Sequence, residues 1–165
     1  MTPDERASRS AQAMWAQDAA SQGMGMQIDA VGPGRAVLSM TVQPHHLNGH
    51  GICHGGFIFT LADSAFAFAC NSYNTLTVAQ ENQITFLSPG RAAERLTATC
   101  EEQARQGRSG IYDVRVTGED GRTVALMRGL SRQVKGQHFE ETGEETPAGG
   151  GDPTGHQTTK ESGNA

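Results

Sequence analysis

The sequence contains no apolar run long enough to cross a membrane. No stretch of its 165 residues reaches the roughly 18–20 apolar residues that a spanning helix needs. The longest apolar segment, residues 57–70, is interrupted by a carboxylate and two hydroxyl side chains. The N-terminus also lacks a basic region followed by an apolar run and a cleavage site, so we expect no secretory signal.

Cysteine is scarce, and no two cysteines lie close together in the sequence. The three that are present, Cys53, Cys70 and Cys100, are odd in number and widely spaced. This pattern is typical of reduced thiols rather than of a disulfide framework. We therefore expect a cytoplasmic protein.

Basic residues are in the minority, and the excess of acids is confined to one end of the chain. Of 18 acids and 13 bases, residues 136–165 hold six acids and one base, which leaves twelve of each in residues 1–135. A neutral domain has no general attraction for nucleic acid. The glycine-rich 136–165 segment has few large apolar side chains, which predicts a disordered acidic tail after one folded domain, residues 1–135.

The chain also lacks the usual signatures of bound phosphate and metal. It has no glycine-rich loop followed by Lys and Ser or Thr. His46, His50 and His54 recur at a spacing that metal ligands use, but Gly49 and Gly51 indicate a loop rather than a helix face. We predict no metal and no organic cofactor, and we expect His45, His46 and His50 at the surface or at the edge of a substrate site.

Hydrophobic periodicity predicts an α+β fold. We expect an N-terminal helix within residues 1–22, a loop at 44–53 and one apolar helix over 54–73. Alternating residues and turn signals predict strands over 23–31, 36–42, 77–87, 96–101, 112–117 and 124–134. No helix-length gap separates the last four strands, so we expect them to form an antiparallel meander, with the helix on one face of a sheet of five or six strands.

Asp63 is the most informative residue of the chain because it is the only charged residue between His54 and Cys70. A carboxylate in a buried helix is costly unless another group pairs with it or uses it. Gly55 and Gly56 open the same helix, where free N–H groups and the positive end of the helix dipole can receive an oxyanion. These features together favour attack on a carbonyl group.

Asp63 and the start of the helix cannot meet within one chain. His54 and Asp63 are nine residues apart, about two and a half turns of one helix. The carboxylate must then meet the helix start of a second copy, or a substrate that lies along the helix. A symmetric dimer with antiparallel helices satisfies the first condition.

The segment 48–71, which runs from Asn48 through His54-Gly55-Gly56 to Asn71, resembles the hotdog-fold acyl-CoA thioesterases. Within them it is most similar to the phenylacetyl-CoA thioesterases of bacterial phenylacetic acid degradation, and residues 84–90 resemble the strand that follows the helix. The resemblance implies an antiparallel sheet wrapped around one long helix. It also implies homodimers that form a continuous sheet, and often homotetramers.

The resemblance also implies a role for each residue of the motif. Asp63 would act as general base or nucleophile on the thioester, and Gly55 would offer its N–H to the thioester oxygen. Asn48 would hold the water or the leaving group, and His54 would order the site. Further substrate contacts are expected from Gly56, Phe59 and Asn71, and coenzyme A phosphates are expected to meet Arg91 and Arg108.

The predicted reaction is hydrolysis of acyl-CoA thioesters, with phenylacetyl-CoA or its ring-hydroxylated forms as substrates. Two alternatives remain open. A hotdog dehydratase or hydratase would pair His54 with an acid of the partner chain, and a noncatalytic protein would bind acyl-CoA without turnover.

Overall fold

The structure is a computed structural model that describes residues 1–141. Three helices are present in this range: α1 (Pro3–Trp15), α2 (Ala19–Gly23) and α3 (Gly55–Cys70). The strands are β1 (Met26–Gly32), β2 (Arg35–Thr41), β3 (Thr77–Phe86), β4 (Arg95–Gln106), β5 (Ser109–Thr117) and β6 (Thr123–Gln133), and a short 3₁₀ turn covers Pro44–His46. No helix within residues 1–141 has the length and apolar character to span a membrane.

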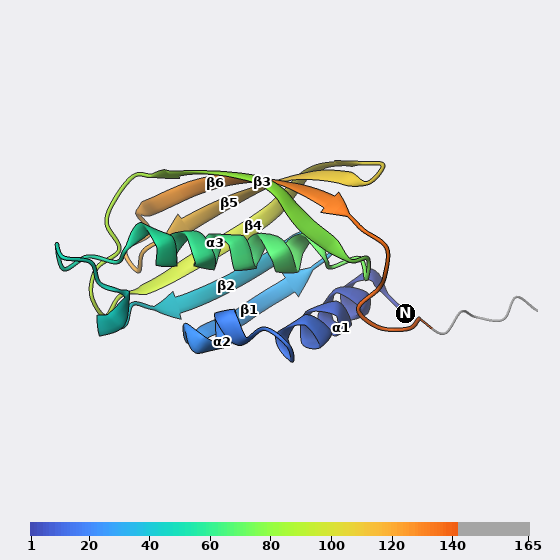
Figure 1. Ribbon diagram of the computed structural model, residues 1–165, viewed down its shortest axis with the longest axis horizontal. Helices are drawn as coiled ribbons and strands as arrows, with labels where there is room; N and C mark the ends of the chain where they lie inside the picture. Colours follow the sequence, from blue (N-terminus) through green and yellow to red (C-terminus); the bar gives the residue numbers. More distant parts are fainter. Residues whose placement is uncertain (142–165) are drawn as a thin grey trace, which may run out of the picture.

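The six strands form one antiparallel sheet in the order β1-β2-β4-β5-β6-β3, with α3 lying along its inner face (Figure 1). This arrangement confirms the predicted α+β fold with a central helix. The predicted N-terminal helix is two helices, because Asp18 accepts a hydrogen bond from the Ser21 amide and caps α2. Figure 1 shows both helices beside β1.

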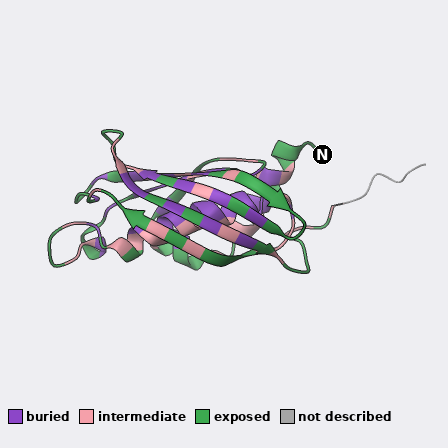
Figure 2. Ribbon diagram, turned by 90° about the horizontal axis from the view of Figure 1, so that it is seen from above, coloured by how far each residue is buried: buried purple, intermediate pink, exposed green. Residues whose placement is uncertain are grey.

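Helix α3 packs on the sheet through both small and large apolar side chains, and its Phe66 ring meets the Tyr112 ring of β5. Ala62, Ala65 and Ala69 are fully buried. On the sheet, every second residue of a strand is buried beneath the helix, such as Leu96, Ala98 and Cys100 of β4. Figure 2 shows the resulting stripes of buried and exposed residues. The period of two that predicted these strands is therefore confirmed, and it produces a core between the helix and one face of the sheet.

The predicted four-strand meander is wrong for its first strand. β4, β5 and β6 are consecutive neighbours, but β3 pairs with β6 at the far edge of the sheet. The 87–94 connection makes this possible by crossing the end of the sheet, since the Leu87 and Ser88 amides bond to Val124 and the Ala93 amide bonds to Val42. Eight extended residues reach about 27 Å, which exceeds the width of three strand spacings.

The ordered contacts continue past the predicted domain boundary at residue 135. Residues 136–141, which we name the C-terminal strap, return along the end of α3 and are held by Asn74 and Leu76. The disordered acidic tail was predicted over residues 136–165, and of these residues 142–165 lie outside the described range.

Asn74 fixes the strap by its side chain and by its backbone. Its φ of 58° lies in the left-handed region, which Asn tolerates better than most residues. Its Oδ1 accepts hydrogen bonds from the His138 and Phe139 amides, and its Nδ2 donates to the Phe139 carbonyl at 3.0 Å.

We therefore expect Asn74→Ala to lower the free energy of unfolding by about 2–4 kcal/mol, because it removes buried hydrogen bonds and strains a left-handed residue. Asn74→Gly is the matched control, since it relieves the backbone and loses only the side-chain bonds. Its expected loss is about 1–2 kcal/mol. Urea denaturation of the three proteins measures both values, and an alanine variant as stable as wild type would contradict the assignment.

Candidate active site

Asp63 lies two turns into α3, half-buried, on the wall of a cavity of about 340 Å³. Its Oδ1 accepts a hydrogen bond of 2.6 Å from the Asn82 amide of β3. Burial raises the pKa of the Asp63 carboxyl, and the hydrogen bond from Asn82 acts in the opposite direction. The carboxylate is thus held in one place and kept more basic than an exposed aspartate.

The fold makes room for Asn82. This residue lies directly opposite Gly129 of β6. A Cβ atom at position 129 would lie 2.8 Å from the Asn82 Oδ1 and 2.8 Å from the Phe66 ring, so only glycine fits there. The Asn82 Oδ1 is buried and has no partner among residues 1–141, which leaves one acceptor of the amide unused beside Asp63.

Asn82 was missed by sequence reasoning. Its signal is weak, because one amide in a polar stretch of strand says nothing about which helix residue lies beneath it. The pairing becomes visible only when β3 is placed next to β6, with Asn82 above α3.

The start of α3 is the second part of the site. His54 caps the helix, since its Nδ1 accepts a hydrogen bond of 2.9 Å from the Gly56 amide. The Gly56 N–H is therefore occupied, whereas the Gly55 N–H at the first helical position has no acceptor recorded among residues 1–141. The Phe86 ring lies on the Cβ side of Gly55, since a Cβ at this position would lie 3.0 Å from its Cζ.

Asn48 belongs to the loop that leads into the helix. Its Oδ1 accepts hydrogen bonds from the His50 amide at 2.9 Å and the Ile52 amide at 3.4 Å. The neighbouring His54 amide donates to the His46 carbonyl. The structure thus brings Asn48, His54 and Gly55 together at one end of α3, with the Asn48 carbonyl oxygen already used to fold the loop.

The structure does not bring Asp63 to this end within one chain. Gly55 and Asp63 are eight residues apart on a continuous helix, a separation of about 12 Å along its axis. The expectation that they cannot meet in one subunit is therefore confirmed.

The predicted substrate contacts have different surroundings. Phe59 is half-buried against the core. Asn71 lines the Asp63 cavity, but its amide is fixed by the Ala67 and Thr77 backbone. Arg91 is exposed and paired with Asp120 at 3.1 Å, and Arg108 is exposed in the β4–β5 turn.

Arg91 and Arg108 flank opposite ends of β4. The 12 residues of this strand span about 40 Å. The two guanidinium groups of one subunit therefore cannot serve the same coenzyme.

The prediction for His46 was wrong. The residue is fully buried, with its ring 4.6 Å from that of Phe57 and its Nδ1 accepting a hydrogen bond from the Gln43 amide. Burial lowers its pKa, so it is neutral near pH 7. Within residues 1–141 no three His, Cys, Asp or Glu side chains lie together as a metal site would require.

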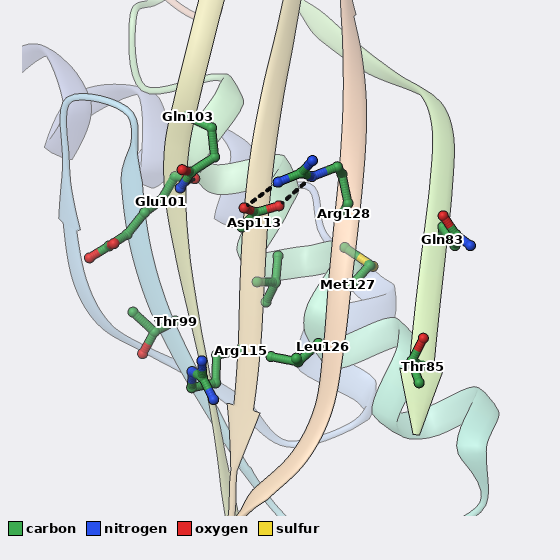
Figure 3. A pocket seen from close by; sticks show the side chains of 11 residues that line it. Gln83, Thr85, Thr99, Glu101, Gln103, Asp113, Arg115, Leu126, Met127 and Arg128 are labelled. Atoms are coloured by element: carbon green, nitrogen blue, oxygen red, sulfur yellow. Dashed lines mark hydrogen bonds and ion pairs between the residues drawn. The ribbon is translucent and has the colours of Figure 1, made fainter. Parts of the chain in front are cut away.

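A larger hollow of about 770 Å³ lies on the outer face of the sheet, away from α3 (Figure 3). Charged residues of both signs line it, and Arg128 binds Asp113 through two hydrogen bonds of 2.7 Å. None of the predicted catalytic residues is among the side chains that line it. The smaller cavity beside Asp63 is therefore the candidate active site.

Comparison with known proteins places the chain in a family. The thioesterase superfamily matches residues 50–125. The acyl-coenzyme A thioesterase PaaI of Escherichia coli is 43% identical over 131 residues, which cover 79% of this chain and 94% of that protein. The chain belongs to the thioesterase superfamily. It is a thioester hydrolase, as its sequence predicted.

Solved structures agree with this assignment. The E. coli PaaI protein, from the phenylacetic acid degradation operon, matches with a TM-score of 0.81 and 41% identity over 82% of this chain and 99% of that one. A hypothetical thioesterase of Streptococcus pneumoniae, solved with coenzyme A, matches with a TM-score of 0.65 and 27% identity, over 68% of this chain and 87% of that one. These matches confirm the hotdog fold.

The raised pKa of Asp63 has a consequence for stability. In the folded protein the pKa of this carboxyl lies above its ordinary value of 3.8, so ionisation favours the unfolded chain. The protonated carboxyl contributes fully to stability below its pKa in the unfolded chain, and this contribution is lost as the pH rises through its pKa in the folded protein.

We therefore expect the stability of Asp63→Asn relative to wild type to increase from about pH 4 to pH 7, because the amide does not ionise. Urea denaturation of both proteins across this range measures the difference, in which all other titrating groups cancel. A difference that is constant with pH, or that falls, would contradict the burial of an ionisable carboxylate at this position.

Proposed function

We propose that this protein hydrolyses acyl-CoA thioesters, with phenylacetyl-CoA or ring-hydroxylated phenylacetyl-CoA as its substrates. The observation that carries the proposal is the Asp63 carboxylate, held by Asn82 on the wall of a mainly apolar cavity. The cavity offers space for an acyl group directly beside a positioned base. The similarity to E. coli PaaI supports coenzyme A as the leaving group.

In the proposed mechanism Asp63 removes a proton from the attacking water or itself attacks the thioester carbon. A positioned carboxylate base contributes about 10²–10⁴-fold to the rate. The Gly55 N–H donates to the developing oxyanion, which is worth about 10²–10³-fold. A thiolate leaves readily, so no metal or organic cofactor takes part.

We propose that each active site is shared by two subunits. β3 has β6 as its only sheet neighbour, which leaves one backbone edge unpaired within residues 1–141. Apolar side chains along and just after this strand are about half-exposed, namely Val78 at 50%, Phe86 at 49% and Leu87 at 57%. Pairing of two β3 edges about a two-fold axis buries them and brings each Asp63 toward the Gly55 of the other copy.

A second contact between dimers would complete a homotetramer. The hollow on the outer sheet face presents both acids and arginines (Figure 3). A surface with both signs of charge can pair with its own copy about a two-fold axis. We propose this face as the contact between two dimers, in a cytoplasmic enzyme.

The other predicted residues keep supporting roles in this proposal. Asn48 and His54 shape the loop and the cap that present the Gly55 N–H, and Gly56 completes the cap. Phe59 and Asn71 border the acyl group. Coenzyme A phosphates would meet Arg91 or Arg108, whose exposed charges are available at little cost.

The dehydratase or hydratase alternative has less support. Such an enzyme needs His54 as a base, but the Nδ1 of His54 accepts the Gly56 N–H, so Nε2 carries the proton and the ring has no free basic nitrogen. The noncatalytic alternative differs from the proposal only in turnover, so an activity assay separates the two.

We expect purified wild-type protein to release free thiol from phenylacetyl-CoA, and Asp63→Asn to reduce kcat by at least about 10²-fold. KM should change little, because the amide fills the same space and the coenzyme binds elsewhere. Thr60→Ala is the control, because it removes an exposed hydroxyl on the same helix that bonds only to the Gly56 carbonyl. Asn82→Asp is not a suitable control, since it adds a charge.

Three other results of these assays would each contradict the proposed hydrolysis by Asp63. Near-normal turnover in a destabilised Asp63→Asn protein would assign the carboxylate a structural role. Tight binding of acyl-CoA without thiol release would support the noncatalytic reading, and hydration of an enoyl-CoA would support the hydratase.

A further inference from the structure

The cavity beside Asp63 continues along α3 to its C-terminal end. From Asp63 to Asn71 the helix advances about 12 Å. Most of the lining is apolar, and the polar side chains at the far end belong to Asn71, Thr77 and His138. A volume of about 340 Å³ is near the lower limit for ligand pockets, which suits a compact acyl group rather than a long chain.

The C-terminal strap closes the far end of this cavity. His138 is the strap residue that lines it, and the backbone amides of His138 and Phe139 both donate to the Asn74 side chain. Helix α1 holds the strap from outside, because Arg6 binds the Glu141 carboxylate at 2.6 and 2.9 Å and the Arg9 guanidinium lies 4.2 Å from the Phe139 ring centre. His138 is therefore fixed in position before a ligand arrives.

The hydrogen bonds of Asn71 determine which nitrogen of His138 carries the proton. The Asn71 Nδ2 donates to the Ala67 and Thr77 carbonyls, and its Oδ1 accepts from the Thr77 amide, so the orientation of the amide is settled. The same Oδ1 lies 2.7 Å from the His138 Nε2, which must then be the donor.

The remaining nitrogen of His138 is an unused acceptor. Burial lowers the pKa of His138, so the ring is neutral near pH 7 and its Nδ1 bears a lone pair. Nδ1 has no hydrogen-bond partner among residues 1–141, and it is not fully enclosed by other atoms. His138 lines the cavity, and Nδ1 is its accessible and unoccupied ring nitrogen.

We propose that His138 is a specificity-determining residue that accepts a hydrogen bond, through Nδ1, from a hydroxyl group at the distal end of a compact acyl group. The proposal rests on the proposed function, in which the acyl group occupies this cavity with its carbonyl at Asp63. An acyl group with an apolar end leaves the acceptor without a partner. One that ends in a carboxylate places a second acceptor against it, and both are disfavoured.

The test compares two substrates in three variants. Wild-type protein should have a higher kcat/KM for 3- or 4-hydroxyphenylacetyl-CoA than for phenylacetyl-CoA. His138→Leu should reduce this preference, the ratio of the two kcat/KM values, by about tenfold, which is the worth of one hydrogen bond. His138→Gln retains an acceptor and should recover part of the preference, and Gln137→Ala, an exposed neighbour on the strap, should leave it unchanged.

A binding measurement keeps this inference separate from the proposed hydrolysis. The dissociation constants of the thioether analogues S-(2-phenylethyl)-CoA and its ring-hydroxylated form report the same preference without turnover. If wild type releases no thiol from any substrate but the thioethers show a His138-dependent preference, the hydrolysis proposal fails and this inference stands. If His138→Leu changes both substrates and both thioethers equally, or changes neither, His138 supports the strap only and the inference is overturned.

Discussion

The hydrogen bond between Asp63 and Asn82 imposes the strictest condition on this fold. A helix made largely of alanine and aromatic residues carries one carboxylate, and the amide that meets it must come from the sheet at 2.6 Å. The amide reaches the carboxylate from β3, which lies at the sheet edge beside β6, and glycine at position 129 leaves the space that the amide needs. The crossing connection at 87–94 and the exposed β3 edge both follow from that placement.

Local patterns were sufficient to predict much of this arrangement. The alternation of β4 and β5, the apolar run of α3 and its glycine-rich start are properties of short segments, and each was correctly assigned. Asp63 and Gly55 stood out for the same reason, because a lone charge and paired glycines are visible in one dimension. The separation of these two residues on one helix also follows from spacing alone.

The features that were missed depend on contacts between distant segments. The position of β3 next to β6, the partnership of Asn82 with Asp63 and the docking of the strap against Asn74 each join residues that are far apart in the sequence. Glycine and acidic residues near residue 136 resemble a disordered tail, yet the strap gains order from Arg6, Leu76 and Asn74. The buried His46 was misjudged in the same way, since a histidine-rich loop does not reveal that its ring packs on Phe57.

The central claim is that Asp63 of one subunit acts with Gly55 of the other, and separately tagged heterodimers test it most directly. One chain would carry Asp63→Ala and the other Gly55→Pro. Proline removes the N–H at a helix position that suits its backbone geometry, and the half-exposed Phe86 ring must shift slightly to admit its side chain. A shared site predicts one intact site in each purified heterodimer and about half of wild-type turnover, while both parent homodimers are inactive. Heterodimers as inactive as their parents would contradict the account.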